Sequence, residues 1–240
     1  MSLSGILFDK DGTLLDFNGT WGPTVAATIA HFSQGDAALA ARIAALNHFD
    51  PLTRTFAPTS PFIAGSSDHY GPMWAQMLGR ADALARKREL DAKLAEEGMK
   101  NHAPIGAPAA VLAALHARGA RIGVATNDSE RGARRQVTAL GLDPYVDFVV
   151  GYDSGHGAKP LPGMVHAFAR FTGLPEKSIA LVGDSTHDLN AARSAGAVGI
   201  AVLSGIAGRD ELAPLADHVL GDISALPALF DALRAAASRA

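Results

Sequence analysis

Two aspartates separated by one residue, Asp9 and Asp11, follow a short apolar run, and Gly12 opens a turn directly after them. Because alternate residues of an extended chain point the same way, both carboxylates are expected to face one site. Neighbouring carboxylates repel each other, and a divalent cation relieves that repulsion. One carboxylate of such a pair can act as a nucleophile while the other carries the proton. Taken alone, Asp-x-Asp-Gly is also a common polar turn that closes a strand.

Groups suited to phosphate follow two later apolar runs. Thr126 and Asn127 stand at the carboxyl end of one run, where hydroxyl, amide and backbone N–H groups can meet phosphate oxygens near a helix start. The alternative is that Thr-Asn-Asp-Ser only caps that helix. Lys159 lies in a loop bounded by Gly157 and Pro160, and its ammonium would balance the charge of a phosphoryl group. A single loop lysine is otherwise usually solvated.

A second acidic pair, Asp184 and Asp188, follows the apolar run that ends at Gly183. Such a pair can hold a metal ion through oxygen ligands, directly and through water, as magnesium prefers. The alternative is that Asp184 and Ser185 merely cap the next helix. Each of the four polar features lies at the end of a predicted strand, so we expect all of them to converge on one edge of one sheet.

The elements that position these residues are short apolar strands alternating with alanine- and leucine-rich helices. Strands are expected at Gly5–Phe8, Ile122–Thr126, Val146–Val150, Ile179–Gly183 and Val198–Leu203. Helices are expected at Pro108–Arg118, Glu130–Leu140, Gly163–Thr172 and Asp188–Ala195, several of them ending before a glycine. This alternation predicts an α/β fold with a parallel sheet covered by helices on both faces.

The first half of the chain differs, because no comparable β-pattern separates Phe8 from Ile122. Helical patterns cover Ala37–Leu46 and Met73–Glu97, and the proline- and serine-containing stretch Pro51–Ser67 breaks them. We therefore predict a core domain of residues 1–16 and 101–240, with a small helical domain of residues 17–100 inserted after the first strand.

The composition narrows the function classes. Hydrophobic residues make up 48% of the 240 residues, charged residues 19%, and the net charge is −3. Without a dense basic stripe, nucleic acid is not an expected partner. The absence of cysteine excludes disulfides and thiolate chemistry. Since no signal peptide and no long apolar segment is evident, we expect a cytoplasmic protein without a membrane partner. The oligomeric state is not readable.

Together the motifs resemble those of the haloacid dehalogenase-like hydrolase superfamily, and most closely its phosphoglycolate phosphatase-like branch. The resemblance covers Ile6 to about Leu203. It implies a Rossmann-like doubly wound core with the inserted helices as a subclass-I cap. The matching residues are Asp9-Lys10-Asp11-Gly12-Thr13, Thr126-Asn127, Lys159-Pro160 and Gly183-Asp184-Ser185-Thr186-His187-Asp188.

The resemblance also implies roles for the matching aspartates. Asp9 would attack phosphorus and form an aspartyl-phosphate, and Asp11 would protonate the leaving group and then activate water. Mg²⁺ would be held by the Asp9 carboxylate, the Asp11 backbone carbonyl and Asp184, with Asp188 supporting these ligands from outside the coordination sphere. The phosphoryl oxygens would be bound by Thr126, Asn127 and Lys159. The partner implied is a small phosphate ester, phosphoglycolate-like or a sugar phosphate.

In the inserted helices, the resemblance points to Gly65 and Ser66 as a substrate-specificity loop, although an ordinary linker explains them equally well. Arg54 is a cation that would meet a second anionic group of the substrate, or else a solvated surface residue.

Other functions remain open at this level. A β-phosphoglucomutase-like phosphomutase shares the motifs and differs mainly in its cap, and a silent ligand-binding member would keep the fold without turnover. The presence of Asp11 and Asp184 argues against a true haloacid dehalogenase, which needs neither Mg²⁺ nor the acid at the position of Asp11. A phosphorelay receiver would be about half this length and would carry its aspartate on a middle strand.

Overall fold

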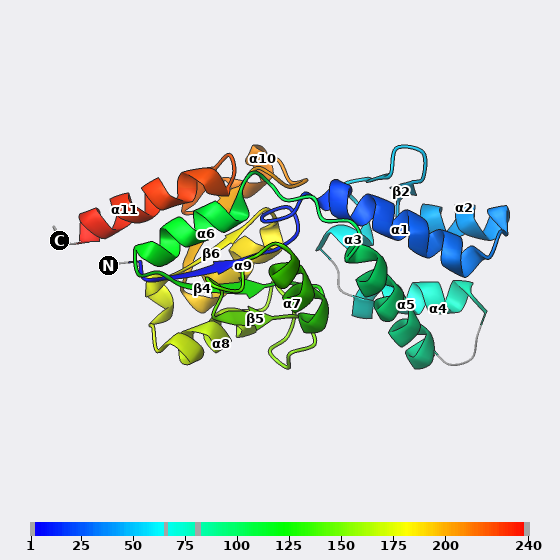
Figure 1. The fold of residues 1–240 in the computed structure, drawn as a ribbon, viewed down its shortest axis with the longest axis horizontal. Coiled ribbons are helices and arrows are strands. Elements are labelled where there is room, and N and C mark those ends of the chain that lie inside the picture. Colours follow the sequence, from blue (N-terminus) through cyan, green and yellow to red (C-terminus); the bar gives the residue numbers. More distant parts are fainter. Residues whose placement is uncertain (1–2, 65–66, 80–82, 238–240) are drawn as a thin grey trace. The chain divides into compact units, whose positions relative to one another are not determined.

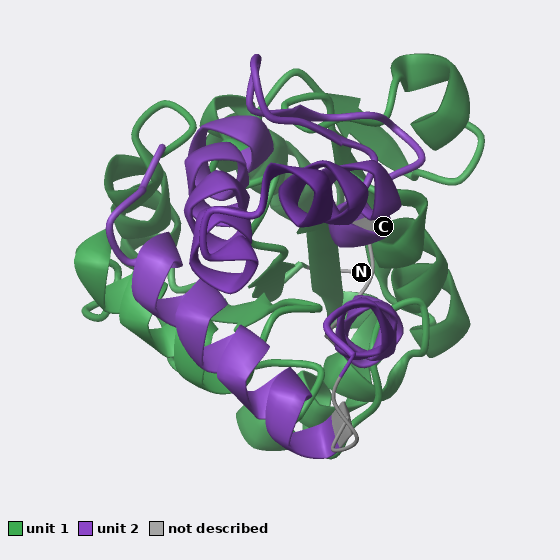
Figure 2. Cartoon of the chain, turned by 90° about the vertical axis from the view of Figure 1, so that its right-hand side faces the viewer, with its two compact units in different colours: residues 1–16, 104–240 green, residues 17–103 purple. Residues whose placement is uncertain are grey.

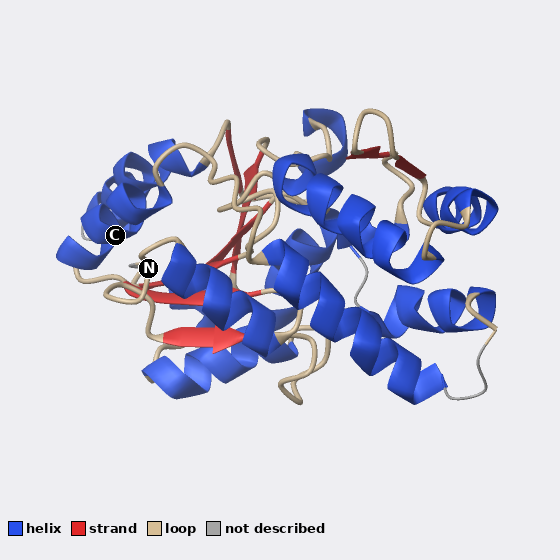
Figure 3. Cartoon of the chain, turned by 45° about the vertical axis from the view of Figure 1, so that its right-hand side comes forward, coloured by secondary structure: helices blue, strands red, loops and turns tan. Residues whose placement is uncertain are grey.

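The computed structural model describes residues 3–64, 67–79 and 83–237. The chain divides into two compact units, one made of residues 1–16 and 104–240 and the other of residues 17–103 (Figure 2). The first unit contains a sheet with helices packed around it, and the second contains helices and two very short strands (Figure 3). Within the described ranges, no helix combines the length and the apolar character that a membrane span requires.

The larger unit is built on a six-stranded sheet in which every pairing is parallel, with the order β5-β4-β1-β6-β7-β8. Its strands are β1 (Gly5–Phe8), β4 (Arg121–Ala125), β5 (Phe148–Val150), β6 (Ile179–Gly183), β7 (Val198–Val202) and β8 (His218–Leu220). In register, Phe8 at the end of β1 lies between Val124 of β4 and Val182 of β6. The carboxyl ends of these three central strands therefore meet at one edge.

Helices cover both faces of this sheet (Figure 1). The unit contains α6 (Pro108–Ala117), α7 (Glu130–Ala139), α8 (Gly163–Thr172), α9 (Thr186–Ala195), α10 (Arg209–Leu212), α11 (Leu226–Ala237) and two 3₁₀ turns at Glu176–Ser178 and Ile223–Ala225. Helices α6, α7 and α11 pack on one face of the central strands, and α8 and α9 pack on the other. The predicted fold class, a Rossmann-like doubly wound α/β core, is confirmed.

The two covered faces explain why the strands are apolar without alternation. In β1, Ile6 and Phe8 enter the core beneath α6, α7 and α11, whereas Leu7 between them enters the core beneath α8 and α9. All three side chains have no solvent exposure. Removing a side chain of this size from water stabilises the fold by roughly 1.5–3 kcal/mol, so both faces favour apolar residues.

Some boundaries differ from the sequence-based expectation. The strand expected from Val146 begins only at Phe148, because the preceding residues form a turn in which the N–H groups of Tyr145 and Val146 both donate to the Leu142 carbonyl. Helix α9 begins at Thr186, two residues early, since Ser185 acts as its N-cap. The edge strand β8 and the final helix α11 were not predicted from the sequence. Strand β8 has only three residues, and α11 consists largely of alanine and leucine.

The smaller unit contains α1 (Phe17–Ser33), α2 (Ala37–Leu46), β2 (Phe49–Asp50), β3 (Thr55–Phe56), α3 (Pro61–Ala64), α4 (Ser67–Met77) and α5 (Ala83–Gly98). The helical stretch expected at Met73–Glu97 is divided into α4 and α5, and that part of the prediction was wrong. Helix α4 is followed by Gly79 with φ of +65°, a left-handed conformation that ends helices.

Aromatic side chains form much of the core of this unit. Phe62 stacks on Tyr70 with ring centroids 4.0 Å apart, and Phe56 stacks on Phe62 at 5.7 Å. Trp74 is fully buried and meets Phe32 edge to face at 5.9 Å. Pairs of this kind add about 0.5–1.5 kcal/mol beyond the area that they bury.

A buried asparagine, Asn47, joins three segments of the same unit. Its side-chain oxygen accepts a hydrogen bond from Trp74 Nε1 at 2.9 Å, and its side-chain nitrogen donates to the Ile43 carbonyl at 2.7 Å. Its own carbonyl accepts from Ser60 Oγ at 2.6 Å. Because Asn47 has no solvent exposure, water cannot replace these partners if the side chain is removed.

We predict that Asn47→Ala lowers the free energy of unfolding of this unit by about 2–3 kcal/mol, because the buried Trp74 N–H loses its acceptor. The two tryptophans of the chain, Trp21 and Trp74, both belong to this unit, so denaturant unfolding followed by their fluorescence measures it directly. The exposed Gln76→Ala is the matched control and should change the value by less than about 0.5 kcal/mol. Equal stability of both variants would contradict the assigned role of Asn47.

Candidate active site

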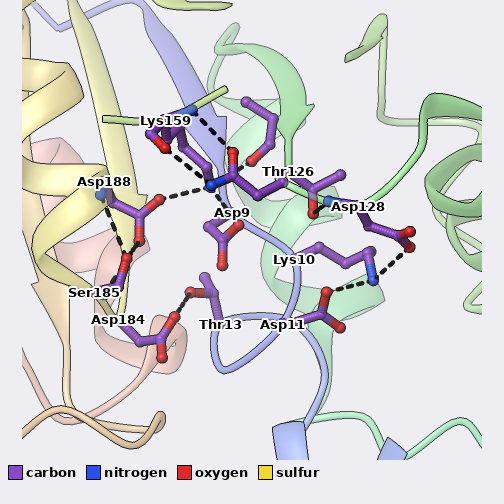
Figure 4. Close-up of polar contacts among 12 residues, drawn as sticks. Asp9, Lys10, Asp11, Thr13, Thr126, Asp128, Lys159, Asp184, Ser185 and Asp188 are labelled. Carbon is purple, nitrogen blue, oxygen red and sulfur yellow. Dashed lines mark hydrogen bonds and ion pairs between the residues drawn. The ribbon is translucent and has the colours of Figure 1, made fainter. Parts of the chain in front are cut away.

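Four loops of the larger unit meet at the carboxyl edge of its sheet. Asp9 directly follows β1, and its N–H donates to the Val182 carbonyl of β6 at 2.8 Å, which extends the sheet by one residue. Asp184 directly follows β6, Thr126 directly follows β4, and Lys159 arrives on the long loop after β5. Figure 4 shows their side chains directed toward one another. The structure therefore brings together residues from all four predicted motifs.

Three carboxylates lie at the centre of this edge. Oxygen atoms of Asp9, Asp184 and Asp188 all lie within 4.8 Å of one another, and the residues are 7%, 6% and 1% exposed. Burial raises the pKa of Asp9 to about 7, against the attraction of Lys159 and with the help of repulsion from Asp188. Burial, followed by repulsion from Asp9 and Asp188, also raises the pKa of Asp184 well above its ordinary value. Burial and mutual repulsion thus make the ionised forms of Asp9 and Asp184 unfavourable.

Lys159 partly neutralises this cluster. Its buried ammonium donates to Asp9 Oδ1 at 2.5 Å, to Asp188 Oδ1 at 2.6 Å and to the Ala125 carbonyl at 2.8 Å. Burial opposes its charge, but the carboxylates of Asp188 and Asp9 outweigh burial and raise the pKa of Lys159, which stays protonated. One ammonium balances the charge of a single carboxylate, so a further cation would favour the ionised forms of the other two.

The Asp184 carboxylate lies directly against two glycines. A Cβ atom placed on Gly205 would lie 1.7 Å from Asp184 Oδ2, and one placed on Gly12, whose φ is +82°, would lie 2.2 Å from it. Thr13 Oγ1 lies 3.5 Å from Asp184 Oδ1. Two glycines thus leave the carboxylate room that any side chain would remove. Carboxylate oxygens at such spacing are the ligands that Mg²⁺ prefers, and the residues present fit that ion.

Asp188 is held in place by groups of the protein. Its Oδ1 accepts from Lys159, and its Oδ2 accepts from both the N–H and the hydroxyl of Ser185, at 3.1 and 2.6 Å. Ser185 and Asp188 form a capping box at the start of α9. Of the capping alternative weighed for this segment, Ser185 acts as the cap, and its hydrogen bonds fix the orientation of the Asp188 carboxylate.

Thr126 and Asn127 stand at the end of β4. Thr126 is 2% exposed, and its hydroxyl accepts from the N–H of Asp128 at 3.0 Å. The carboxamide of Asn127 makes two hydrogen bonds to the main chain of Lys159, accepting from its N–H at 2.9 Å and donating to its carbonyl at 3.0 Å. Asn127 therefore fixes the backbone of the residue that neutralises Asp9, an arrangement that the sequence did not indicate.

Sequence reasoning also missed a second buried lysine, Lys10, which is 1% exposed. Its ammonium lies 2.6 Å from Asp11 Oδ2 and 3.4 Å from Asp128 Oδ2. Burial opposes its charge, but attraction by Asp11 and then Asp128 raises the pKa of Lys10. No pattern in the sequence indicates this pairing, because Lys10 lies in the turn after β1 and Asp128 belongs to a different loop.

The residues expected to select the substrate are placed differently. Arg54 belongs to the smaller unit, is exposed, and adopts a left-handed backbone with φ of +56° in the turn between β2 and β3. Gly65 and Ser66 lie outside the described residues. The specificity hypotheses for these three residues therefore stay predictions.

Comparison with known proteins identifies the family of this chain. A family model for haloacid dehalogenase-like hydrolases matches residues 3–196. A phosphoglycolate phosphatase of Yersinia pestis is 30% identical over 202 residues, which cover 81% of this chain and 78% of the relative. A phosphoglycolate phosphatase of Rhodospirillum rubrum is 37% identical over 145 residues, covering 58% and 59%. The chain belongs to the haloacid dehalogenase-like hydrolase family and is similar to phosphatases within it.

Solved structures share the fold. A crystal structure described as a predicted phosphoglycolate phosphatase from Haemophilus somnus superposes with a TM-score of 0.68 at 20% identity, over 95% of this chain and 98% of that one. A family hydrolase from Deinococcus radiodurans, solved with bound phosphate and sodium, gives a TM-score of 0.65 at 20% identity over 96% of both chains. At such identities the likeness concerns the fold.

The network around Lys159 leads to a stability prediction. In the presence of a chelator, Lys159→Met should lower the free energy of unfolding of the larger unit by roughly 3 kcal/mol, because Asp9 and Asp188 remain buried without their cation. Urea unfolding followed by circular dichroism measures the change. The exposed Lys177→Met removes a lysine from the same unit without touching the cluster, and its stability should match that of the unchanged chain. A Lys159→Met protein as stable as this control would contradict the prediction.

Proposed function

We propose that the protein is a Mg²⁺-dependent phosphatase that hydrolyses a small phosphate monoester through an aspartyl-phosphate on Asp9. The observation that carries the proposal is the buried cluster of Asp9, Lys159 and Asp184 at the carboxyl edge of the sheet. Two carboxylates and an ammonium lie close together there, and in this proposal they are the nucleophile, the metal ligand and the cation that binds the phosphoryl group. Membership of a hydrolase family with phosphatase relatives supports the same conclusion.

In the first half-reaction, a carboxylate oxygen of Asp9 forms a bond to phosphorus as the bond from phosphorus to the ester oxygen breaks. Asp11, two residues along the chain, donates its proton to the departing alkoxide. In the second, Asp11 takes a proton from water, whose oxygen attacks phosphorus and releases inorganic phosphate from Asp9. The alcohol and phosphate leave, and both carboxyl groups return to their starting state.

The charge on the phosphoryl group requires compensation throughout. Thr126, Asn127 and Lys159 bind the phosphoryl oxygens in this proposal. Lys159 supports the role through its ammonium, which already lies beside Asp9. Asn127 supports it further through the two hydrogen bonds that hold the main chain of Lys159 in place.

Mg²⁺ would be held by the Asp9 carboxylate, the Asp11 carbonyl and Asp184, and it would neutralise charge that develops on the phosphoryl oxygens. Asp188 would support these ligands without binding the ion itself. The engagement of both of its oxygens by Lys159 and Ser185 favours that supporting position.

The helical unit, proposed as residues 17–100, would act as a cap over a core of residues 1–16 and 101–240. Its insertion directly after the loop that carries Asp9 and Asp11 supports this role. Specificity would come from cap residues, with Gly65, Ser66 and Arg54 as candidates. A small, phosphoglycolate-like ester is the proposed substrate class, in line with the relatives from Yersinia pestis and Rhodospirillum rubrum.

The decisive experiment is a screen of the purified chain against small phosphate monoesters, with Mg²⁺ and with a chelator. Release of inorganic phosphate that requires Mg²⁺ is the expected result. Hexose 1-phosphates belong in the panel, because isomerisation to the 6-phosphate without net release would indicate a phosphomutase. No turnover across the panel would indicate a silent member of the family.

Replacing the nucleophile should abolish turnover. In Asp9→Asn the amide cannot attack phosphorus, so kcat should fall by at least about a thousandfold, while the circular dichroism spectrum stays unchanged. Incubation with substrate followed by acid quench and mass spectrometry should detect a phosphorylated Asp9 in the unchanged chain and none in the variant. Asp16→Asn, an exposed aspartate at the end of the same loop, is the control and should retain activity. Substantial turnover by Asp9→Asn would reassign the nucleophile.

Displacing the Asp184 carboxylate should weaken the proposed metal site. In Gly205→Ala the new methyl group overlaps the Asp184 carboxylate, so the Mg²⁺ concentration for half-maximal activity should rise roughly 10–100-fold. Asp184→Ala should raise it further or eliminate activity. At Gly208, three residues away, a Cβ meets nothing within 4 Å, so Gly208→Ala should leave the titration unchanged. Unchanged titrations of Gly205→Ala and Asp184→Ala would remove Asp184 from the metal site.

A further inference from the structure

The proposed reaction makes no use of Lys10, although this lysine is 1% exposed and occupies the position between the two reacting aspartates. Its ammonium lies 2.6 Å from Asp11 Oδ2 and 3.4 Å from Asp128 Oδ2 (Figure 4). Burying an ammonium is unfavourable unless carboxylates or hydrogen-bond acceptors compensate for the lost water. An apolar side chain would fill this position without that penalty, so the charge itself calls for an explanation.

The main chain of Lys10 is as firmly held as its side chain. Its carbonyl accepts hydrogen bonds from the N–H groups of Leu14 and Leu15, at 2.8 and 3.0 Å, and both leucines are fully buried. These two hydrogen bonds close the turn that contains Asp11 onto the main chain of Lys10. Any movement of the lysine ammonium would be transmitted to Asp11, whose carboxylate it contacts.

Asp128, which also lies near the Lys10 ammonium, is held by hydrogen bonds to residues that follow β4 and β5. Its Oδ1 accepts from the N–H of Ser129 at 2.6 Å, its carbonyl accepts from Tyr152 at 3.1 Å, and its N–H donates to Thr126 Oγ1. It stands between β4 and α7, just after the residues proposed to bind the phosphoryl group. Lys10 thus links Asp11 to a hydrogen-bonded residue of the neighbouring loop.

We propose that Lys10 is a positioning residue that, anchored by Asp128, holds the Asp11 carboxyl group in place for proton transfer to the leaving group. The inference rests on the proposed function, because it assigns a support to the acid of that reaction. A side chain held by an ammonium on a fixed anchor keeps one orientation, and proton transfer depends on that orientation.

A role in positioning Asp11 predicts different effects on alkyl and aryl phosphate esters, whereas a role in general stability does not. When the bond from phosphorus to an alkyl oxygen breaks, the alkoxide needs the proton of Asp11, whereas p-nitrophenolate is a stable anion and leaves without one. Loss of Asp11 positioning should therefore slow cleavage of an alkyl phosphate and spare that of p-nitrophenyl phosphate. The ratio kcat/KM reports this step, because it covers events up to formation of the aspartyl-phosphate.

The test compares Lys10→Met with the unchanged chain, both saturated with Mg²⁺, on 2-phosphoglycolate and p-nitrophenyl phosphate. We expect kcat/KM to fall about 10–100-fold for the alkyl ester and less than about threefold for the aryl ester. In Asp11→Asn, kcat/KM should again fall more for the alkyl ester, and the difference between the two esters should be larger. Lys177→Met, the exposed lysine control, should leave both values unchanged. Equal losses on the two esters, or no loss, would overturn the proposal.

Asp128→Asn tests the anchoring role of Asp128. As in Lys10→Met, kcat/KM should fall more for the alkyl ester than for the aryl ester. Because Asp128 acts through Lys10, the double variant should be no worse than Lys10→Met alone, whereas multiplied losses would overturn the anchoring role. If Lys10→Met does not fold, the double variant with Asp128→Asn should fold better, because it removes the carboxylate that Lys10→Met leaves without its ammonium. Asp128→Asn alone also tests the proposal, through its effect on the two esters. Absence of turnover in the unchanged chain, or its persistence in Asp9→Asn, would instead reject the proposed function.

Discussion

The contact on which the site depends is the buried ammonium of Lys159 among Asp9, Asp188 and the Ala125 carbonyl. Carboxylates packed this closely repel one another, and burial further disfavours their charged forms, as the raised pKa of Asp9 records. A fixed cation is what allows them to share one edge of the sheet. The excess negative charge that remains is the physical reason for expecting a divalent cation beside Asp184.

A second lysine extends this arrangement. Lys159 serves the carboxylates on the side of Asp188, and Lys10 serves Asp11 and Asp128 on the other side (Figure 4). The nucleophile proposed for the reaction lies between the two groups. The site therefore consists of two sets of carboxylates, each paired with its own lysine; in the proposed reaction one set serves the metal and the phosphoryl group and the other serves proton transfer.

The parallel sheet makes this division possible. Its register places the ends of β1, β4 and β6 at one level, so short loops suffice to bring distant residues of the chain together. The loop after β1 also leads into the helical unit, which leaves the rigid core free of any insertion among its other strands. Chemistry and specificity can thus reside in separate parts of the chain, which is how one fold serves many substrates.

The sequence by itself determined the fold class, most strands and the convergence of Asp9, Thr126, Lys159 and Asp184, because each follows an apolar run long enough to identify a buried strand. Only the tertiary structure decided the pairings within the site. The hold of Asn127 on Lys159 and of Lys10 on Asp128 joins residues far apart in sequence, and neither side chain follows a periodic pattern. The division of the stretch Met73–Glu97 into two helices, by contrast, follows from a local feature, the left-handed Gly79 after α4. Periodicity reveals which face of an element is buried, whereas the partner of a buried polar group depends on which loops the fold brings side by side.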